Sequence, residues 1–226
     1  MNKENAAVLE RLKQGNELYI KNNQNAGDVS LELRKKTAKE GQHPYAIVIT
    51  CSDSRVIPDA IFSAGIGDLF VIRVAGNVLD NHQLGSIEYA FSHLETNVIV
   101  MLGHTKCGAI EASQRSIAHA IERPNEVRMR SAKQSQDCEA GLHISERDMA
   151  HIHKHAGDDK FIKYILEDIS EAIGDETDDY KATVLNVKHG VNVIKNAFHD
   201  HPDIEDGELD VLGAVYDIET GVVEWI

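Results

Sequence analysis

The sequence is poor in residues that would mark several classes of protein. It has 3 cysteines in 226 residues, an odd and small number that does not make a disulfide framework, so metal binding or thiol chemistry remain as their interpretations. It has only 4 prolines, and 42% of its residues are hydrophobic, which excludes collagen-like, low-complexity and disordered chains. We therefore expect a globular protein that forms a single domain over residues 1–226.

Positive charge and long apolar runs are also scarce. The chain has 23 Lys and Arg against 37 Asp and Glu, a formal charge of −14, so its surface repels phosphate backbones and anionic headgroups. No run approaches the roughly 18 apolar residues of a membrane-spanning helix, and the first residues lack the apolar core of a signal peptide. We expect neither nucleic acid nor membrane as a partner, and a cytoplasmic location.

The hydrophobic pattern alternates between strand and helix. Apolar residues at helical spacing predict an amphipathic helix over residues 5–22, with Gly15-Asn16 as a weak point. Runs of β-branched and aliphatic residues predict buried parallel strands at 45–50, 69–74 and 98–102, with helices at 86–94 and 183–198. Runs at 210–216 and 222–226 flank a turn and predict a closing hairpin. The fold class is therefore α/β, with a central, mostly parallel β-sheet flanked by helices and a C-terminal antiparallel strand or hairpin.

Chemistry-bearing residues directly follow two of the predicted strands. The first strand is followed by Cys51-Ser52-Asp53-Ser54-Arg55, and the third by Gly103-His104-Thr105-Lys106-Cys107-Gly108. If these strands are parallel neighbours, their carboxyl ends lie about 5–10 Å apart, so Cys51, His104 and Cys107 can converge. Two thiolates and one imidazole suit a tetrahedral zinc ion with one coordination position left over.

Several interpretations of these residues stay open at this point. A water molecule in the fourth position would make a catalytic centre, because zinc lowers the pKa of bound water to about 7. Asp53 could fill that position instead, or Arg55 could hold its carboxylate away from the metal. Cys51 and His104 could also form a metal-free nucleophile and base, or the cysteines could be inert core residues.

Read together, the two motifs resemble the zinc-binding motifs of the β-class carbonic anhydrases. The likeness extends from about residue 16 to 110 and resumes at 213–217 and 220–221, in ordered blocks at similar separations. The resemblance implies an N-terminal helical arm, residues 1–40, laid across a partner subunit. It also implies self-association as a dimer or tetramer.

The resemblance further implies roles for individual residues. Cys51, His104 and Cys107 would bind one zinc ion per subunit, and Asp53 with Arg55 would form the catalytic dyad, Asp53 becoming a fourth ligand in a closed state. Other implied site residues are Gln42, whose amide would donate a hydrogen bond to a substrate oxygen, and the substrate-cleft residues Phe70, Ala75 and Tyr89. For the three cleft residues, plain core packing is the alternative.

The implied activity is that of a carbonic anhydrase, a zinc lyase that reversibly hydrates carbon dioxide to bicarbonate by means of zinc-bound hydroxide. One alternative is a zinc hydrolase on the same scaffold that acts on carbon disulfide or carbonyl sulfide. Another is a non-catalytic zinc-binding protein in which Asp53 is a permanent ligand.

Some positions depart from the family pattern. Val48 stands where certain members have a tryptophan that, with the equivalent of Arg73, forms a regulatory bicarbonate pocket, so we do not expect that pocket. Residues 115–159 form a polar insertion, predicted to be helical but irregular. Histidines in and after it are expected to be exposed rather than a second metal site, and Cys138 is expected not to be a ligand; these histidines are His143, His151, His153, His155, His199 and His201.

Overall fold

The structure, a computed structural model, describes residues 1–122, 161–201 and 209–226. Its contacts divide it into two compact units. The first comprises Met1–Thr105 together with Val187–Ile226, and the second comprises Lys106–Asn186. The single domain over residues 1–226 stays a prediction.

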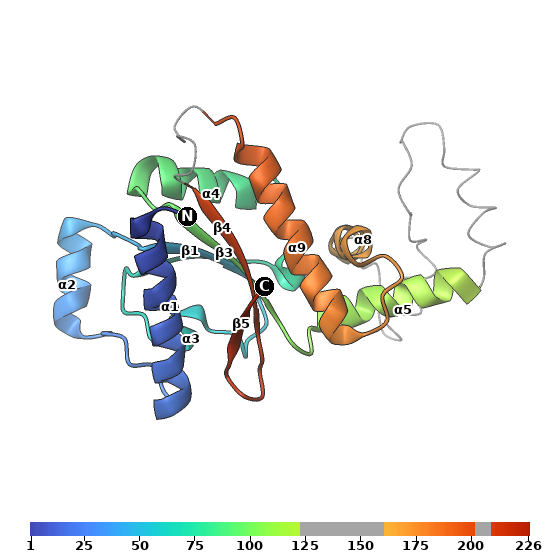
Figure 1. Ribbon diagram of the computed structural model, residues 1–226, viewed down its shortest axis with the longest axis horizontal. Helices are drawn as coiled ribbons and strands as arrows, with labels where there is room; N and C mark the ends of the chain where they lie inside the picture. The colour runs from blue at the N-terminus through green and yellow to red at the C-terminus, as the bar shows by residue number, and fades with distance from the viewer. Residues whose placement is uncertain (123–160, 202–208) are drawn as a thin grey trace. The chain divides into compact units, whose positions relative to one another are not determined.

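Within the described residues, the first unit is built on a five-stranded sheet in the order β2-β1-β3-β4-β5 (Figure 1). The first four strands are parallel to their neighbours, and β5 runs antiparallel to β4. The strands are β1 (Ala46–Thr50), β2 (Leu69–Arg73), β3 (Val98–His104), β4 (Asp210–Tyr216) and β5 (Val223–Trp225). The mostly parallel sheet and the C-terminal hairpin are thus confirmed.

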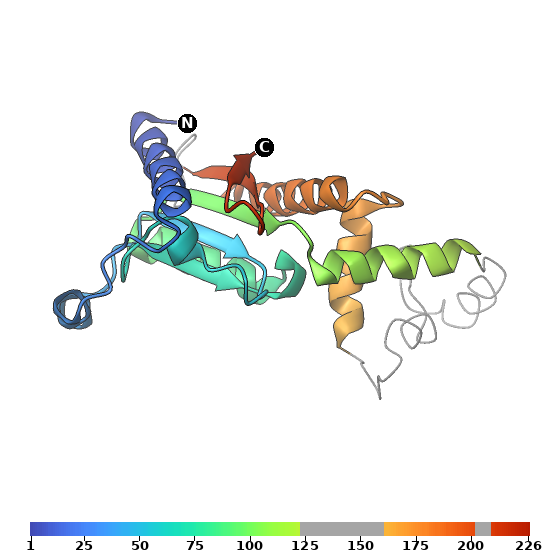
Figure 2. The same ribbon diagram turned by 90° about the horizontal axis from the view of Figure 1, so that it is seen from below.

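Both faces of the central strands are covered by helices, and every residue of β1 and β3 is buried. On one face lies α1 (Figure 2), whose Leu12 belongs to a buried cluster with Val48 and Val100. On the other, Met101 lies so close to Gly190 of α9 that a β-carbon there would be 2.2 Å from the methionine methyl. The helices of this unit are α1 (Lys3–Asn22), α2 (Leu31–Glu40), α3 (Pro58–Ile61), α4 (Asn81–Leu94) and the later part of α9 (Asp179–Phe198).

The expected weak point in the first helix is wrong, because α1 runs without a break through Gly15 and Asn16. A β-carbon on Gly15 would lie 2.0 Å from the carbonyl oxygen of Phe62, so the glycine permits a close approach of two backbones. The buried Asn16 amide donates to the carbonyl oxygens of Ile61 and Gly221, at 3.2 and 2.9 Å. These two residues therefore dock the helix against its own chain; its packing across a partner stays a prediction.

The second unit contains α5 (Gly108–Glu122), α8 (Ile162–Ile173) and the first turns of α9, and α8 crosses α5 (Figure 2). Their contact is partly apolar, with the buried Leu166 of α8 against Ala112 of α5, and partly polar, with the Ser113 and Ser170 hydroxyls 2.7 Å apart and both within hydrogen-bond distance of the Leu166 carbonyl oxygen. Residues 115–122 of the expected insertion continue α5. Its remainder from residue 123, with Cys138 and four of the histidines, lies outside the described residues. No helix in the described ranges is long and apolar enough to cross a membrane.

Candidate metal centre

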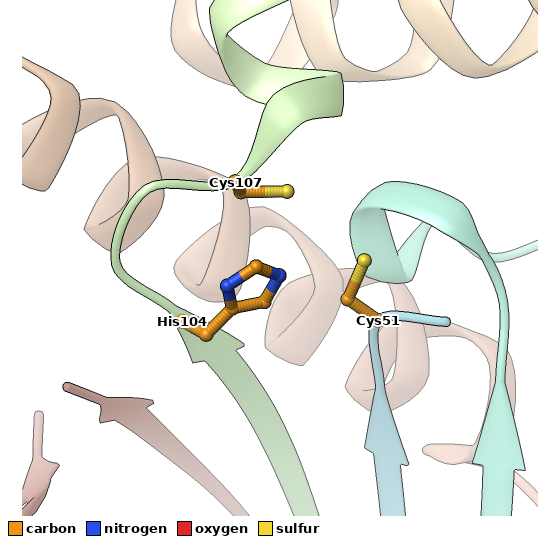
Figure 3. A group of neighbouring side chains, drawn as sticks. All are labelled: Cys51, His104 and Cys107. Atoms are coloured by element: carbon orange, nitrogen blue, oxygen red, sulfur yellow. The ribbon is translucent and has the colours of Figure 1, made fainter. Parts of the chain in front are cut away.

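The three predicted metal ligands converge where β1 and β3 end. The two strands are parallel and in register, with Thr50 opposite Leu102, so the residues that follow them emerge at the same edge of the sheet. One ligand atom each from Cys51, His104 and Cys107 lies within 4.8 Å of the others, and all three residues are buried. The sulfur atoms and the imidazole ring face a common space (Figure 3). Among the described residues, this is the only such group of three.

The imidazole of His104 has one nitrogen in position to bind a metal. Its Nδ1 lies 2.9 Å from the carbonyl oxygen of Thr105, which can only accept, so Nδ1 carries the hydrogen. Nε2 therefore keeps its lone pair, and it is buried without a hydrogen-bond partner among the described residues. A buried nitrogen in this state is costly unless something binds it, and a metal ion would do so.

The surroundings of both cysteines offer N–H groups or positive potential to a sulfur that binds a metal. Cys51 Sγ accepts backbone N–H groups from Asp53 and Gly76, at 3.4 and 3.3 Å. Gly76 has φ +67° in the turn that follows β2, a conformation that suits glycine. Cys107 immediately precedes α5, whose N-terminal end carries partial positive charge. Two such sulfurs and one neutral imidazole fit a zinc ion.

Asp53 is held by Arg55 in the described structure. Arg55 donates through Nε to Oδ1 at 2.9 Å and through Nη2 to Oδ2 at 2.6 Å, so both carboxylate oxygens are engaged. These hydrogen bonds, with a smaller contribution from the backbone N–H of Arg55, hold the pKa of Asp53 well below its ordinary value. The carboxylate is therefore ionised and is directed by the arginine; its use as a fourth metal ligand in a closed state stays a prediction.

Arg73 braces the same loop, a role that the sequence reasoning missed. Its Nε donates to the carbonyl oxygen of Cys51 at 3.2 Å and its Nη2 to that of Asp53 at 2.7 Å. The register explains the placement, because Arg73 ends β2 opposite Thr50, one residue before Cys51. In the sequence, only the resemblance drew attention to Arg73, and it pointed to the regulatory bicarbonate pocket of certain family members instead of to this loop.

Comparison with known proteins decides the family. A sequence profile described as "Carbonic anhydrase" matches residues 46–223. The chain belongs to the β-class carbonic anhydrase family. Among curated carbonic anhydrases, the Pseudomonas aeruginosa protein is 34% identical over 202 residues, which cover 84% of this chain and 76% of that one. Carbonic anhydrase 2 of Mycobacterium tuberculosis is 43% identical over 111 residues, which cover 49% of this chain and 53% of that one.

Solved structures support the fold. The Coccomyxa β-carbonic anhydrase, solved in complex with acetazolamide, superposes with a TM-score of 0.54 at 25% identity, covering 87% of this chain and 84% of that one. The match to the mycobacterial carbonic anhydrase spans only about half the length of that relative. Family membership thus rests on the profile and on the longer matches.

The four other predicted site residues do not all lie at the metal centre. Ala75 directly precedes Gly76, which contacts Cys51. Phe70 and Tyr89 pack on each other, with ring centroids 6.2 Å apart, and Tyr89 is 49% exposed. Gln42 is exposed and precedes β1, whereas Cys51 follows it, so a strand of five residues, about 17 Å long, separates them. The structure of one chain therefore does not bring Gln42 to the metal centre.

The two described histidines of the late cluster join no group of three metal-binding side chains within the described residues. His199 Nε2 lies 2.7 Å from the carboxylate of Asp200. His201 Nε2 lies 3.3 Å from that of Glu88, and its ring packs edge-on against Phe91 at 5.0 Å. His201 thus helps to hold the end of α9 on α4. It is 17% exposed at the side chain, so it is more buried than expected.

Proposed function

We propose that this chain is a zinc-dependent carbonic anhydrase, a lyase that interconverts carbon dioxide and bicarbonate with one zinc ion per subunit. The observation that carries the proposal is the buried group of Cys51, His104 and Cys107, with ligand atoms within 4.8 Å of one another. The neighbouring Asp53 carboxylate is paired with Arg55 instead of joining that group. Three protein ligands are the number that catalytic zinc sites use, with water as the fourth ligand.

The protein's own residues have separate tasks in this reaction. The three ligands would hold a zinc ion, which would supply the Lewis acid that makes water nucleophilic near neutral pH. The ionised Asp53 accepts a hydrogen bond from the attacking water and so fixes its orientation toward carbon dioxide. Arg55 keeps that carboxylate in place through two hydrogen bonds. Burial of the ligands limits competing interactions with bulk water.

The predicted role of Gln42 is linked to self-association. Because β1 separates Gln42 from Cys51 within one chain, only the Gln42 of a second copy could donate its amide to a substrate at this centre. A dimer or tetramer is therefore part of the proposal, as are the substrate-cleft roles of Phe70, Ala75 and Tyr89. The proposed location is the cytoplasm, and fractionation of cells would test it.

The central experiment measures stopped-flow hydration of carbon dioxide beside zinc content, for the wild-type chain and for Asp53→Ala. We expect wild-type activity to scale with bound zinc. Asp53→Ala should keep its zinc and lose most of its turnover, because the water loses its orienting acceptor. The matched control is Ser54→Ala, which changes an exposed neighbour in the same loop and should leave both quantities near wild type.

Four results would contradict the proposal or a part of it. A zinc-loaded chain without hydration activity, or activity in a zinc-free chain, would contradict the assigned function. Near-wild-type turnover in Asp53→Ala would contradict the role of that residue. Faster conversion of carbon disulfide or carbonyl sulfide than of carbon dioxide by the same sample would favour the alternative hydrolase.

A further inference from the structure

Thr105 links the metal centre to a distant part of the chain. It follows the ligand His104, and its carbonyl oxygen is the acceptor for Nδ1 of the imidazole, at 2.9 Å. Any displacement of this carbonyl would rotate the ring or remove the bond that leaves Nε2 as the metal-binding nitrogen. The position of Thr105 therefore matters for the ligand that precedes it.

Thr105 is itself held by the C-terminal hairpin through three hydrogen bonds. Its backbone N–H donates to the carbonyl oxygen of Tyr216 at 3.0 Å, which continues the ladder between β3 and β4. Its hydroxyl oxygen accepts the backbone N–H of Ile218 at 3.1 Å. The same hydroxyl donates its hydrogen to the carboxylate of Asp217. A hydroxyl can do both at once, so Thr105 is fixed from its backbone and from its side chain.

Asp217 is held rigidly enough to serve as an anchor. Its Oδ1 accepts the backbone N–H of Thr220 at 2.7 Å, the Thr220 hydroxyl at 2.8 Å and the backbone N–H of Glu219 at 3.1 Å. The turn closes through a bond from the Gly221 N–H to the Asp217 carbonyl oxygen, at 2.9 Å. The hydrogen bonds from Thr220, with lesser ones from Glu219 and Thr105, lower the pKa of Asp217, so it is an ionised acceptor at neutral pH.

We propose that Asp217 is a positioning residue of the metal centre: together with the N–H of the next residue, Ile218, it holds the Thr105 hydroxyl and so fixes the carbonyl that orients His104. This inference rests on the proposed zinc site. Partners of this kind, one step outside the ligands, commonly contribute about 10–100-fold to metal affinity. The alternative is that Asp217 serves only to close the hairpin turn.

The test compares four variants of the full chain by zinc affinity, by the visible spectrum with cobalt in place of zinc, and by chemical unfolding of the metal-free protein. Thr105→Val removes the hydroxyl but keeps the backbone carbonyl, and Asp217→Asn removes the charged acceptor. We expect each to weaken zinc binding by about 10-fold and to change the cobalt spectrum. Thr105→Ser restores the hydroxyl and should return both to about wild type, within about 2-fold.

Thr220→Val is the matched control, because it removes a hydroxyl that donates to Oδ1 of the same carboxylate and leaves the Thr105 side chain in place. We expect it to lower unfolding stability while leaving zinc affinity within about 2-fold of wild type. Equal stability losses in Thr105→Val and Thr220→Val, with zinc affinity unchanged in both, would overturn the inference. If Thr105→Val does not fold, Asp217→Asn tests the same link by its zinc affinity and its cobalt spectrum.

The outcome separates this inference from the proposed function. A wild-type chain that binds no zinc tightly would contradict the proposed function itself. A wild-type chain that binds zinc, with all four variants unchanged in affinity and spectrum, would contradict only the role of Asp217. Combining Thr105→Val with Asp217→Asn should weaken binding no further than either alone, because the two side chains act on His104 in series.

Discussion

The two loops that carry the metal ligands are braced from different distances along the chain. The β1 loop, residues 51–55, is held by Arg73 and Gly76 from the adjacent strand and the turn after it, and by its own pair of Asp53 with Arg55. The β3 loop, residues 104–107, is held by the hairpin turn of residues 217–222, with Ile218 lying 113 positions from Thr105. Each loop thus combines a backbone contact of its own to a ligand, from Asp53 N–H to Cys51 or from the Thr105 carbonyl to His104, with partners from elsewhere in the chain.

The difference shows how one metal centre depends on two folding events. The partners of the β1 loop are in place once β1 and β2 pair through a short crossover. The partners of the β3 loop require the C-terminal strands to join the sheet, so closing that longer loop costs more conformational entropy. We infer that the β3 loop gains its final geometry only when β4 and its hairpin are docked.

Removing a metal ligand should have the largest effect on zinc binding, and the effect should be the same whether the ligand comes from the β1 loop or from the β3 loop. Cys51→Ser and Cys107→Ser each take away a thiolate, so we expect zinc per chain to fall close to zero and hydration activity to be lost. The loss should exceed the roughly 10–100-fold that an outer partner costs. Metal analysis after dialysis measures it. Cys138→Ser is the control, and zinc loss there with zinc retained in Cys51→Ser would contradict the ligand assignment.

Asn16→Ala should come next, because Asn16 fastens the hairpin that braces the β3 loop to α1. The buried amide donates to Ile61 and Gly221 and accepts the backbone N–H of Val223, at 3.0 Å. Leaving these groups unpaired should lower the free energy of unfolding by about 2–4 kcal/mol. Chemical denaturation measures the change, with the exposed Asn22→Ala on the same helix as control. An equal change in unfolding free energy in Asn16→Ala and Asn22→Ala would mean that contacts other than those of the Asn16 amide hold the hairpin on α1.

Arg73→Met should have a smaller effect, and it acts on the other loop. The variant keeps the aliphatic stem and loses the two donors to the carbonyl oxygens of Cys51 and Asp53. Because the side chain is exposed, we expect a loss of about 1–2 kcal/mol in unfolding free energy and weaker zinc binding. Arg73→Lys should recover only part of both, since an ammonium cannot reproduce the two-pronged geometry. Full recovery by lysine would show that charge alone is required.

Much of this metal centre could be predicted from the sequence, because its ligands directly follow strands that short runs of apolar residues reveal. The apolar runs located the strands, the rule for parallel sheets placed Cys51 and His104 at one edge, and the residue types indicated zinc. The braces could not be predicted, since Thr105 and Asp217 meet only through the register of β3 with β4. The predicted weak point at Asn16 is wrong for a similar reason, because the partners of its amide lie far away in the sequence. A glycine and an asparagine within a helix predict weakness unless their distant partners are known.

The smallest effect should come from Tyr19→Phe, which tests how much of the hairpin's attachment to α1 depends on that residue. The hydroxyls of Tyr19 and Tyr216 are 3.3 Å apart, which is long for a bond between two oxygens. The Tyr19 ring also packs close to Gly221, where a β-carbon would lie 3.2 Å from it, and phenylalanine keeps that packing. We therefore expect a loss of about 0.5–1 kcal/mol in unfolding free energy, with zinc affinity unchanged. Tyr216→Phe removes the same bond from the other side, so the double variant should lose no more than either single one. Additive losses in the double variant would mean that each hydroxyl has a separate partner. If Tyr19→Phe alone lowers the free energy of unfolding as much as Asn16→Ala does, then the tyrosine pair, and not the Asn16 amide, is the main contact between the hairpin and α1.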